Sequence, residues 1–340
     1  MNNNTRKLPK LTNLKVIKDN LHVDGLLYYY QNDDFNRLPK SLSFDEGLTS
    51  LAKHTSGAYI SFISNSSSIG VKVKLAGKSY MPHFTATGTI GLDLYVLNED
   101  KYVFLGTTKL DEAEFTYTFI RGMTRTNKEF RLYLPIYMQL LELEIIIDAN
   151  ARIKQDPKIN KPKIICYGTS ITQGGCATRG GMSYSSILGR HLKEYDIYNL
   201  GFSGNAHLQS EIATLISEVD NLKILIMEVE ANAGAIGVLE DRLENFIKII
   251  LSKNPTLKIY LISHYPHSHS LFNPTLKAKM LRHKIFQEEI CNKYSKNMSF
   301  IDGEEILKDL EYEETVDLVH LTDLAFYQIA KYFKNIILKK

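Results

Sequence analysis

The chain has 340 residues, which is long for one typical domain and comfortable for two. Its apolar content of 44% and charged content of 23% are ordinary for a soluble globular protein. The formal net charge is only +3, and lysine and arginine are spread along the chain. Nucleic-acid-binding proteins more often show a concentrated basic stripe, so we expect no nucleic-acid partner.

The N-terminal 20 residues contain no apolar core of signal-peptide length. No segment approaches the roughly 20 apolar residues of a membrane span. We therefore expect a soluble, cytoplasmic protein with no membrane partner. The three cysteines, Cys166, Cys176 and Cys291, form an odd and sparse set, which gives no disulfide framework.

Residues 20–150, after a lead segment at 1–19, are typical of an all-β domain. Apolar and polar side chains alternate with period two at 71–75, 115–119 and 130–134, as in strands with one buried face. Two further apolar runs, 91–96 and 101–105, flank a polar hairpin loop. Many short strands separated by turn signals predict a β-sandwich or jelly roll.

Residues 151–162 are polar and include two prolines, so we interpret them as a linker between domains. From residue 163 to 340, apolar strands alternate with amphipathic helices, which predicts an α/β domain with a parallel sheet. Thr322 is the expected N-cap of the last helix. Strands are expected at 164–166, 197–200, 222–228, 257–262 and 298–301, and helices near 184–194, 239–251, 274–294 and 326–337.

Four segments of this second half carry side chains suited to acyl transfer. Ligands of an open parallel sheet bind outside the carboxyl ends of its strands, at a switch in strand order. Ser170 directly follows the first strand of this half, and Asn232 follows the third. In a flavodoxin-like order, 2-1-3-4-5, these two strands are neighbours. The segments are Gly168-Thr169-Ser170-Ile171, Asn199-Leu200-Gly201-Phe202-Ser203-Gly204, Glu230-Ala231-Asn232-Ala233 and Asp317-Leu318-Val319-His320.

A serine nucleophile needs a base within hydrogen-bond reach, and the base needs a partner that orients it. Asp317 and His320 are three residues apart, so one tight turn can present both. We expect His320 to take the proton of Ser170 and Asp317 to hold the imidazole. The expected oxyanion donors are the backbone N–H groups of Ser170 and Gly204 and the side-chain amide of Asn232.

Each segment has a simpler interpretation when it is taken alone. A Gly-Thr-Ser after a strand is usually a helix N-cap or a turn, an Asp-x-x-His is usually a solvated loop, and an Asn after a strand usually forms a turn. Their occurrence together, in a fixed order and at predicted strand ends, favours the catalytic interpretation.

The second half also resembles the SGNH (GDSL-type) hydrolases, a superfamily of esterases and acylhydrolases with a flavodoxin-like, three-layer fold. YGTSITQGG, NLGFSGN, ILIMEVEANAG and DLVH resemble its four blocks, in order. The resemblance places the nucleophile at Ser170, the oxyanion donors at Gly204 and Asn232, and the acid–base pair at Asp317 and His320. No cofactor is expected for such a reaction.

Two of the four blocks depart from the pattern of that family. The acidic residue that usually precedes the nucleophile is Thr169 here. The third block usually reads Gly-x-Asn-Asp, whereas this chain has Glu230 and Ala233 at the first and last positions. Neither change removes a predicted catalytic atom, but both alter the loops that present those atoms.

The first half is similar to the jelly-roll domain found in a two-domain SGNH subgroup, the family-two carbohydrate acetylesterases. The resemblance is carried by Asn36-Arg37-Leu38-Pro39 and by MPHFTATGTIGLDLYV at 81–96. It implies a serine esterase that removes acetyl or other short acyl groups through an acyl-enzyme, with an O-acetylated carbohydrate as substrate. Two alternatives stay open: an O-acyltransferase that uses the same residues on a sugar or alcohol acceptor, and a non-catalytic glycan-binding protein.

Two histidines outside the four blocks are candidate substrate contacts. His83 lies in a loop of the first half, and His267 lies after the fourth strand of the second half. A structural role in a turn is an equally good interpretation of His83. The HYPHSHS stretch around His267 contains no cysteine or carboxylate, and loop histidines are usually solvated, so we expect no metal site. The sequence leaves the oligomeric state open.

Overall fold

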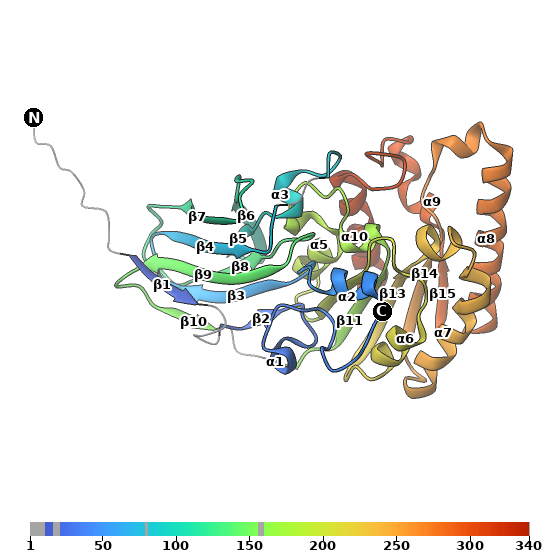
Figure 1. The fold of residues 1–340 in the computed structure, drawn as a ribbon, viewed down its shortest axis with the longest axis horizontal. Helices are drawn as coiled ribbons and strands as arrows, with labels where there is room; N and C mark the ends of the chain where they lie inside the picture. The colour runs from blue at the N-terminus through green and yellow to red at the C-terminus, as the bar shows by residue number, and fades with distance from the viewer. Residues whose placement is uncertain (1–10, 16–20, 79–80, 156–159, 340) are drawn as a thin grey trace, which may run out of the picture.

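A computed structural model describes residues 11–15, 21–78, 81–155 and 160–339 of the chain. An antiparallel β-sandwich lies beside an α/β domain built on a parallel sheet, as Figure 1 shows. Residues 1–10 and 16–19 of the predicted lead segment, and residues 156–159 of the predicted linker, lie outside the described residues.

The β-sandwich consists of two antiparallel sheets that share one apolar core. In strand β4, Val71 and Val73 point into this core, while the alternating Lys72 and Lys74 are exposed to solvent. The predicted sandwich is therefore confirmed. One sheet has the order β1 (Leu11–Lys15), β9 (Leu140–Asp148), β4 (Ile69–Leu75), β7 (Glu114–Ile120). The other has the order β10 (Ile153–Gln155), β3 (Tyr59–Ser64), β8 (Lys128–Tyr133), β5 (Asp93–Asn98), β6 (Lys101–Thr107), and β2 (Val23–Asp24) also pairs with β3.

Two of these strands come from segments that the sequence analysis assigned to neither domain. Strand β1 lies within the predicted lead segment and pairs with β9, and β10 lies within the predicted linker and pairs with β3. The expected hairpin is formed by β5 and β6, in which Asn98 is opposite Lys101. The described residues of this half also form three short helices, α1 (Tyr29–Asn32), α2 (Glu46–Ala52) and α3 (Ala86–Thr89).

The second half contains a five-stranded parallel sheet with the order 2-1-3-4-5, which is the flavodoxin-like order predicted from the sequence. Strand β11 therefore lies between β12 and β13, and the segments that follow these three strands lie at the same edge of the sheet. The strands, from one edge to the other, are β12 (Asp196–Gly201), β11 (Lys163–Gly168), β13 (Leu222–Glu228), β14 (Lys258–Ile262) and β15 (Met298–Ile301).

Helices cover both faces of this sheet, so the domain has three layers. Neighbouring residues of β11 point to opposite faces: Ile165 packs with helices α6 (Ser210–Ser217), α7 (Leu239–Lys253) and α8 (Pro274–Lys293), and Ile164 packs with α5 (Tyr184–His191), α9 (Gly303–Leu307) and α10 (Asp323–Leu338). The remaining short elements are α4 (Ser170–Gln173), the 3-10 turns η1 (Gly180–Met182), η3 (Ser268–Leu271) and η4 (Lys308–Leu310), and the π-helical turn η2 (Glu230–Gly234).

Thr322 occupies the predicted N-cap position, and two details of the predicted helices differ in the structure. Helix α10 does begin after Thr322, but the Thr322 hydroxyl donates to the carbonyl of Glu314 (3.3 Å) and makes no capping bond. Helix α5 ends at His191, three residues before the predicted end at 194. In the described part of the chain, no helix is long and apolar enough to cross a bilayer.

The two domains share a buried arginine. Arg37 is 1% exposed, and its guanidinium donates to the carbonyls of Asn199 (3.2 Å) and Gly201 (2.6 Å) in β12 and of Leu51 (2.8 Å) in α2. It also lies over the ring of Phe202. Burial lowers the pKa of Arg37 to about 9. The side chain therefore fixes the end of β12 to the N-terminal half, next to the segment that carries Gly204.

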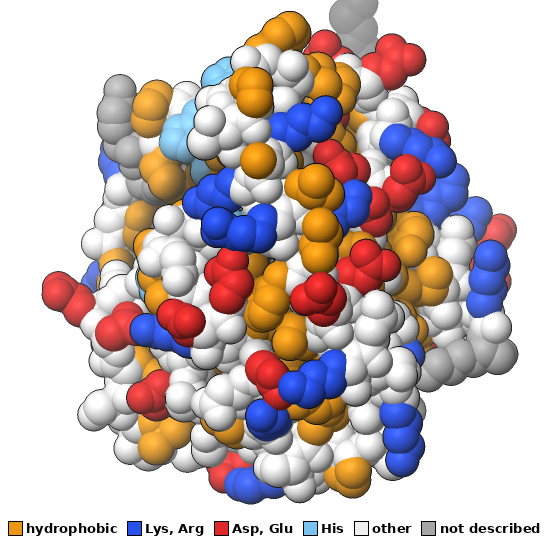
Figure 2. All heavy atoms as spheres, turned by 90° about the vertical axis from the view of Figure 1, so that its right-hand side faces the viewer, with side chains coloured by type: hydrophobic (Ala, Val, Ile, Leu, Met, Phe, Trp, Pro, Cys, Tyr) orange, Lys and Arg blue, Asp and Glu red, His pale blue; other side chains and the backbone are white. Residues whose placement is uncertain are grey.

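The face that contains α8 has a mixed surface. Figure 2 shows basic and acidic side chains interspersed on it, with apolar side chains exposed between them. Leu281 and Ile285 of α8 are exposed apolar residues. This mixture of positive and negative side chains agrees with the even spread of charged residues along the sequence.

Candidate active site

Ser170, His320 and Asp317 form one hydrogen-bonded chain at the carboxyl edge of the parallel sheet. Nε2 of His320 lies 2.9 Å from Oγ of Ser170, and Nδ1 of His320 lies 2.7 Å from Oδ2 of Asp317. Ser170 is the first residue of α4, directly after β11, and is 5% exposed. The structure thus brings together the three side chains that the sequence analysis expected to meet.

The turn from Asp317 to His320 holds the carboxylate in place. Oδ1 of Asp317 accepts hydrogen bonds from the backbone N–H groups of Val319 (3.1 Å) and His320 (2.7 Å), while Oδ2 faces the imidazole. Partial burial opposes ionisation of Asp317, but the bonds from His320 and Val319 outweigh it and lower its pKa. An ionised Asp317 accepts a hydrogen bond from the N–H at Nδ1 of His320. Nε2 of the same ring then carries no proton and can accept a hydrogen bond from the Ser170 hydroxyl.

Gly204 and Asn232, the two other predicted oxyanion donors, lie in segments on either side of Ser170. Gly204 follows β12, is exposed, and has a φ of +70°, which favours glycine. Asn232 lies in η2, after β13. Its Oδ1 accepts from the backbone N–H of Ala206 (3.3 Å), so the amide nitrogen is the end left to donate elsewhere. This bond also links the two segments to each other.

Backbone contacts tie these segments to the serine turn. The N–H of Phe202 donates to the carbonyl of Gly168 (2.8 Å), and the N–H of Thr169 donates to the carbonyl of Glu228 (3.2 Å). At the other end of α4, the side-chain oxygen of Gln173, its last residue, accepts a hydrogen bond from the backbone N–H of Ser203 (3.0 Å). The loops after β12 and β13 are therefore held next to the turn that presents Ser170.

Thr169, which departs from the family pattern, bonds to a buried carboxyl group. Its hydroxyl donates to Oε2 of Glu228 (2.7 Å) and accepts from the N–H of Ile171 (3.2 Å). Burial raises the pKa of Glu228 to about 8, so this carboxyl group is largely protonated at neutral pH. The threonine thus joins the start of α4 to the end of β13.

The β-sandwich supplies three aromatic side chains to the same place. Tyr137 donates from Oη to the carbonyl of Ser170 (3.4 Å), and the Phe84 ring stands edge-on to the rings of Tyr137 and His320. Nε2 of His83 lies 3.6 Å from Oδ2 of Asp317. Sequence reasoning identified His83 as a candidate but missed Tyr137, which stands in no motif, and Phe84, which is the neighbour of His83 in the MPHFTATG stretch.

Four side chains at this site, two of them from the triad itself, lie close enough together to hold a metal ion. His83, Cys176, Asp317 and His320 each offer one ligand atom, and these atoms lie within 4.8 Å of one another. Sγ of Cys176 lies 3.4 Å from the carbonyl oxygen of His83, and burial raises the pKa of this thiol to about 12. A metal here would use the imidazole and carboxylate that bond to each other, so it would compete with the Ser170 arrangement. The expectation of no metal stays a prediction.

A cavity of about 310 Å³ adjoins the triad within the α/β domain. Its wall includes Ile171, Ala231 and Leu318, the chain neighbours of Ser170, Asn232 and Asp317. His267, the second candidate substrate contact, also lines it. Most of the wall is apolar, with Tyr265, Pro266, Leu276, Met280 and Val319 among its members, and polar groups enter from Glu230, His264, Lys279 and His283. This is the usual character of a small-molecule site.

Comparison with known proteins agrees with this architecture. Residues 160–338 match the GDSL-like lipase/acylhydrolase family, and residues 12–153 match the N-terminal domain of SGNH-hydrolase-type esterases. No curated protein matches the chain. The fold is that of an SGNH hydrolase with an N-terminal β domain. The chain belongs to the GDSL-like lipase/acylhydrolase family.

Solved structures show the same two-domain arrangement. A Bacteroides ovatus protein described as a GDSL-like lipase is 28% identical, with a TM-score of 0.88 over 97% of this chain and 98% of that one. Salicylyl-acyltransferase SsfX3, from a tetracycline biosynthetic pathway, is 20% identical, with a TM-score of 0.73 over 97% and 98%. A family-two carbohydrate esterase from Cellvibrio japonicus is 12% identical, with a TM-score of 0.60 over 98% and 98%. The last two likenesses concern the fold. The family and its esterase neighbours support an esterase-type enzyme.

Proposed function

We propose that the protein is a serine esterase that works through an acyl-enzyme. The observation that carries the proposal is the continuous chain from Oγ of Ser170 through His320 to Asp317, with bonds of 2.9 and 2.7 Å. A hydroxyl, an imidazole and an oriented carboxylate at these distances match the geometry that activates a serine nucleophile.

In the first step, Ser170 attacks the ester carbonyl and His320 accepts its proton. Asp317 stabilises the imidazolium that forms. The tetrahedral oxyanion receives hydrogen bonds from the N–H groups of Ser170 and Gly204 and from the Asn232 amide. His320 then protonates the departing alcohol, and water, deprotonated by the same imidazole, releases the acid from Ser170.

The proposed substrate is an ester of acetate or another short acid, with an O-acetylated carbohydrate as the natural compound. The likeness in fold to family-two carbohydrate esterases supports the carbohydrate. We place the acyl group in the cavity beside Ile171 and Ala231, which exceeds the room that an acetyl group needs. The alcohol would then lie toward His320 and the sandwich, where His83 is a partly exposed candidate contact.

A second candidate function is acyl transfer to a sugar or alcohol. It is supported by the likeness in fold to a salicylyl-acyltransferase over almost the whole chain. The same residues would serve, with an acceptor hydroxyl in place of water. The two functions differ in whether the acyl group appears on an added acceptor faster than free acid is released.

The test is a panel of p-nitrophenyl esters and acetylated sugars, assayed with the wild-type protein and Ser170→Ala. We expect Ser170→Ala to lose hydrolysis of p-nitrophenyl acetate and to unfold at the same temperature as the wild type. Asn232→Ala should lower kcat by about 10²- to 10³-fold. Equal rates for Ser170→Ala and the wild type on every ester would refute the nucleophile and favour the glycan-binding alternative.

A further inference from the structure

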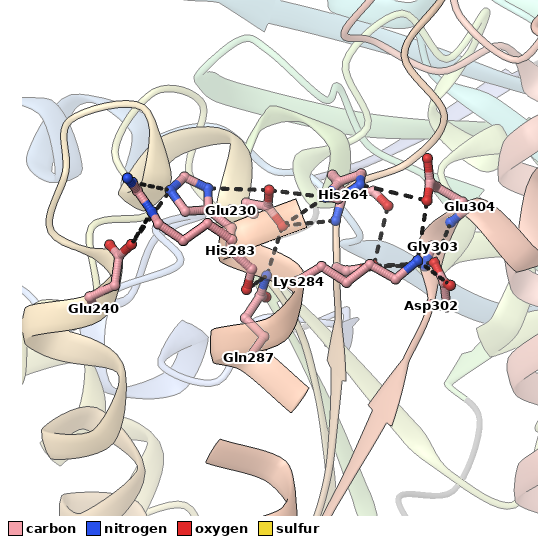
Figure 3. A network of polar contacts seen from close by, with 11 residues as sticks. Glu230, Glu240, His264, His283, Lys284, Gln287, Asp302, Gly303 and Glu304 are labelled. Carbon is pink, nitrogen blue, oxygen red and sulfur yellow. Dashed lines mark hydrogen bonds and ion pairs between the residues drawn. The ribbon is translucent and has the colours of Figure 1, made fainter. Parts of the chain in front are cut away.

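The carboxylate of Glu230, one of the two departures in the third block, lies at the centre of a buried polar network. Figure 3 shows it between His264 and His283, with Gln287 below it. It is 7% exposed. Its oxygens accept from the backbone N–H of His264 (3.0 Å) and the Gln287 amide (2.7 Å), and they lie 3.0 and 3.3 Å from Nδ1 of His264 and of His283.

The network is charged around neutral pH. Burial opposes the charge of Glu230, but the bonds from His264, His283 and Gln287 outweigh it and lower its pKa to about 2. Burial also opposes the charge of His264, but its contacts with Glu230 and Glu304 raise its pKa to about 9. An ion pair of this kind is costly to break on one side, because the partner stays buried without its counter-charge.

Glu230 is also the first residue of the turn that contains Asn232. This turn is η2, and Asn232 is its third residue. The backbone carbonyl of Asn232 accepts from the N–H of Ala235 (3.1 Å), and its side-chain oxygen accepts from Ala206. Glu230 anchors one end of this short turn to the loop after β14 and to α8. The position of the Asn232 amide thus depends on an anchor outside the turn itself.

The other end of the turn fits closely around the network. A Cβ added to Gly234 would lie 2.8 Å from Cε1 of His283, so a larger residue there would press on the imidazole that contacts Glu230. Gly234 therefore leaves room for the same His283 ring that contacts Glu230.

We propose that Glu230 is a positioning residue for the oxyanion hole: through His264, His283 and Gln287 it fixes η2 so that the Asn232 amide points at the developing oxyanion. This role rests on the proposed serine esterase function. In this role the side chain of Glu230 holds the turn from outside. Displacements of about 1 Å at a catalytic group can cost about 10²-fold in rate.

The test is a double-mutant cycle with Glu230→Gln and Asn232→Ala, assayed with p-nitrophenyl acetate. Glu230→Gln keeps the size of the side chain but loses its charge. We expect it to lower kcat by about tenfold while KM changes less than about twofold, because only the transition state uses the oxyanion donor. In the Asn232→Ala background, Glu230→Gln should have no further effect on kcat.

A matched control is Glu304→Gln, which removes the carboxylate 3.8 Å from Nε2 of His264, on the side away from η2. We expect its kcat to stay within about twofold of the wild type. If Glu230→Gln does not fold, Gln287→Met takes its place, since it removes one donor to the same carboxylate and should show the same dependence on Asn232.

The outcomes separate this inference from the function on which it rests. An active Ser170→Ala would overturn the proposed function and this role with it. An inactive Ser170→Ala together with a wild-type kcat for Glu230→Gln would overturn the positioning role alone. Equal losses from Glu230→Gln with and without Asn232 would also overturn it, since Glu230 would then act on another group.

Discussion

Replacing Asp317 by asparagine isolates the orienting role of the carboxylate. The side-chain oxygen of Asn can keep the two backbone bonds that Oδ1 now accepts from Val319 and His320, so the turn should survive. Its NH₂ group would then face Nδ1 of His320, 2.7 Å from the present carboxylate oxygen. Because two donors cannot bond to each other, the imidazole would keep its proton on Nε2 and donate to Ser170. A base in the wrong tautomer cannot accept the serine proton.

Loss of the correct tautomer in such a triad costs about 10⁴-fold in kcat, or about 5 kcal/mol of transition-state stabilisation. We therefore expect Asp317→Asn to hydrolyse p-nitrophenyl acetate about 10⁴-fold more slowly than the wild type. Its Tm should stay within about 2 °C, as for a partly exposed substitution that keeps its backbone bonds. Asp317→Ala is the control, since it also loses those bonds and should lower the Tm further. A kcat for Asp317→Asn within tenfold of the wild type would refute the assignment of the imidazole tautomer.

Three further predictions concern the domain contact, pH and metals. Arg37→Met should lower the free energy of unfolding by about 3 kcal/mol in urea, because three carbonyls lose a charged donor; a change below about 0.5 kcal/mol would contradict this role. The pKa of Glu228 rises from 4.5 to about 8 on folding, so its protonated form favours the native state and its contribution is lost as pH rises from 4.5 through 8. Glu228→Gln should therefore flatten the fall of Tm between pH 6 and pH 9, and an unchanged slope would count against it. Zinc added to the enzyme should act only as an inhibitor, by binding side chains that Ser170 needs, and EDTA should restore ester hydrolysis. Cys176→Ala should raise the inhibitory zinc concentration by about tenfold; equal inhibition of both proteins would exclude the thiol as a ligand.

Local patterns in the sequence were sufficient for most of the fold. Alternation at 71–75 predicted β4, and the apolar run at 222–228 predicted the central strand β13, because a strand buried on both faces needs apolar side chains on both. The short spacing of Asp317 and His320 and the position of Ser170 after β11 predicted that the three side chains meet. Their catalytic roles stay predictions until the variants are measured.

Contacts between distant segments were beyond the reach of such patterns. Tyr137 lies in no motif, and its bond to the carbonyl of Ser170 depends on how the two domains are placed. Strands β1 and β10 are short and mostly polar or exposed, so alternation did not reveal them. Thr322 has the residue type of an N-cap, but a nearby carbonyl of Glu314 competes for its hydroxyl. The only sign of the network around Glu230 in the sequence is that Glu230 departs from the family pattern, and this departure alone does not predict what the residue does.

The contribution of the β-sandwich to the triad has a consequence for protein engineering. Phe84 and Tyr137 form part of the surroundings of His320 and Ser170, and Arg37 is bound by carbonyls of β12. If the C-terminal half were produced alone, the groups that the sandwich now covers, such as the β12 carbonyls bound by Arg37, would be exposed to water. An exchange of the sandwich between relatives would therefore have to carry these three side chains with it to keep the surroundings of Ser170 and His320.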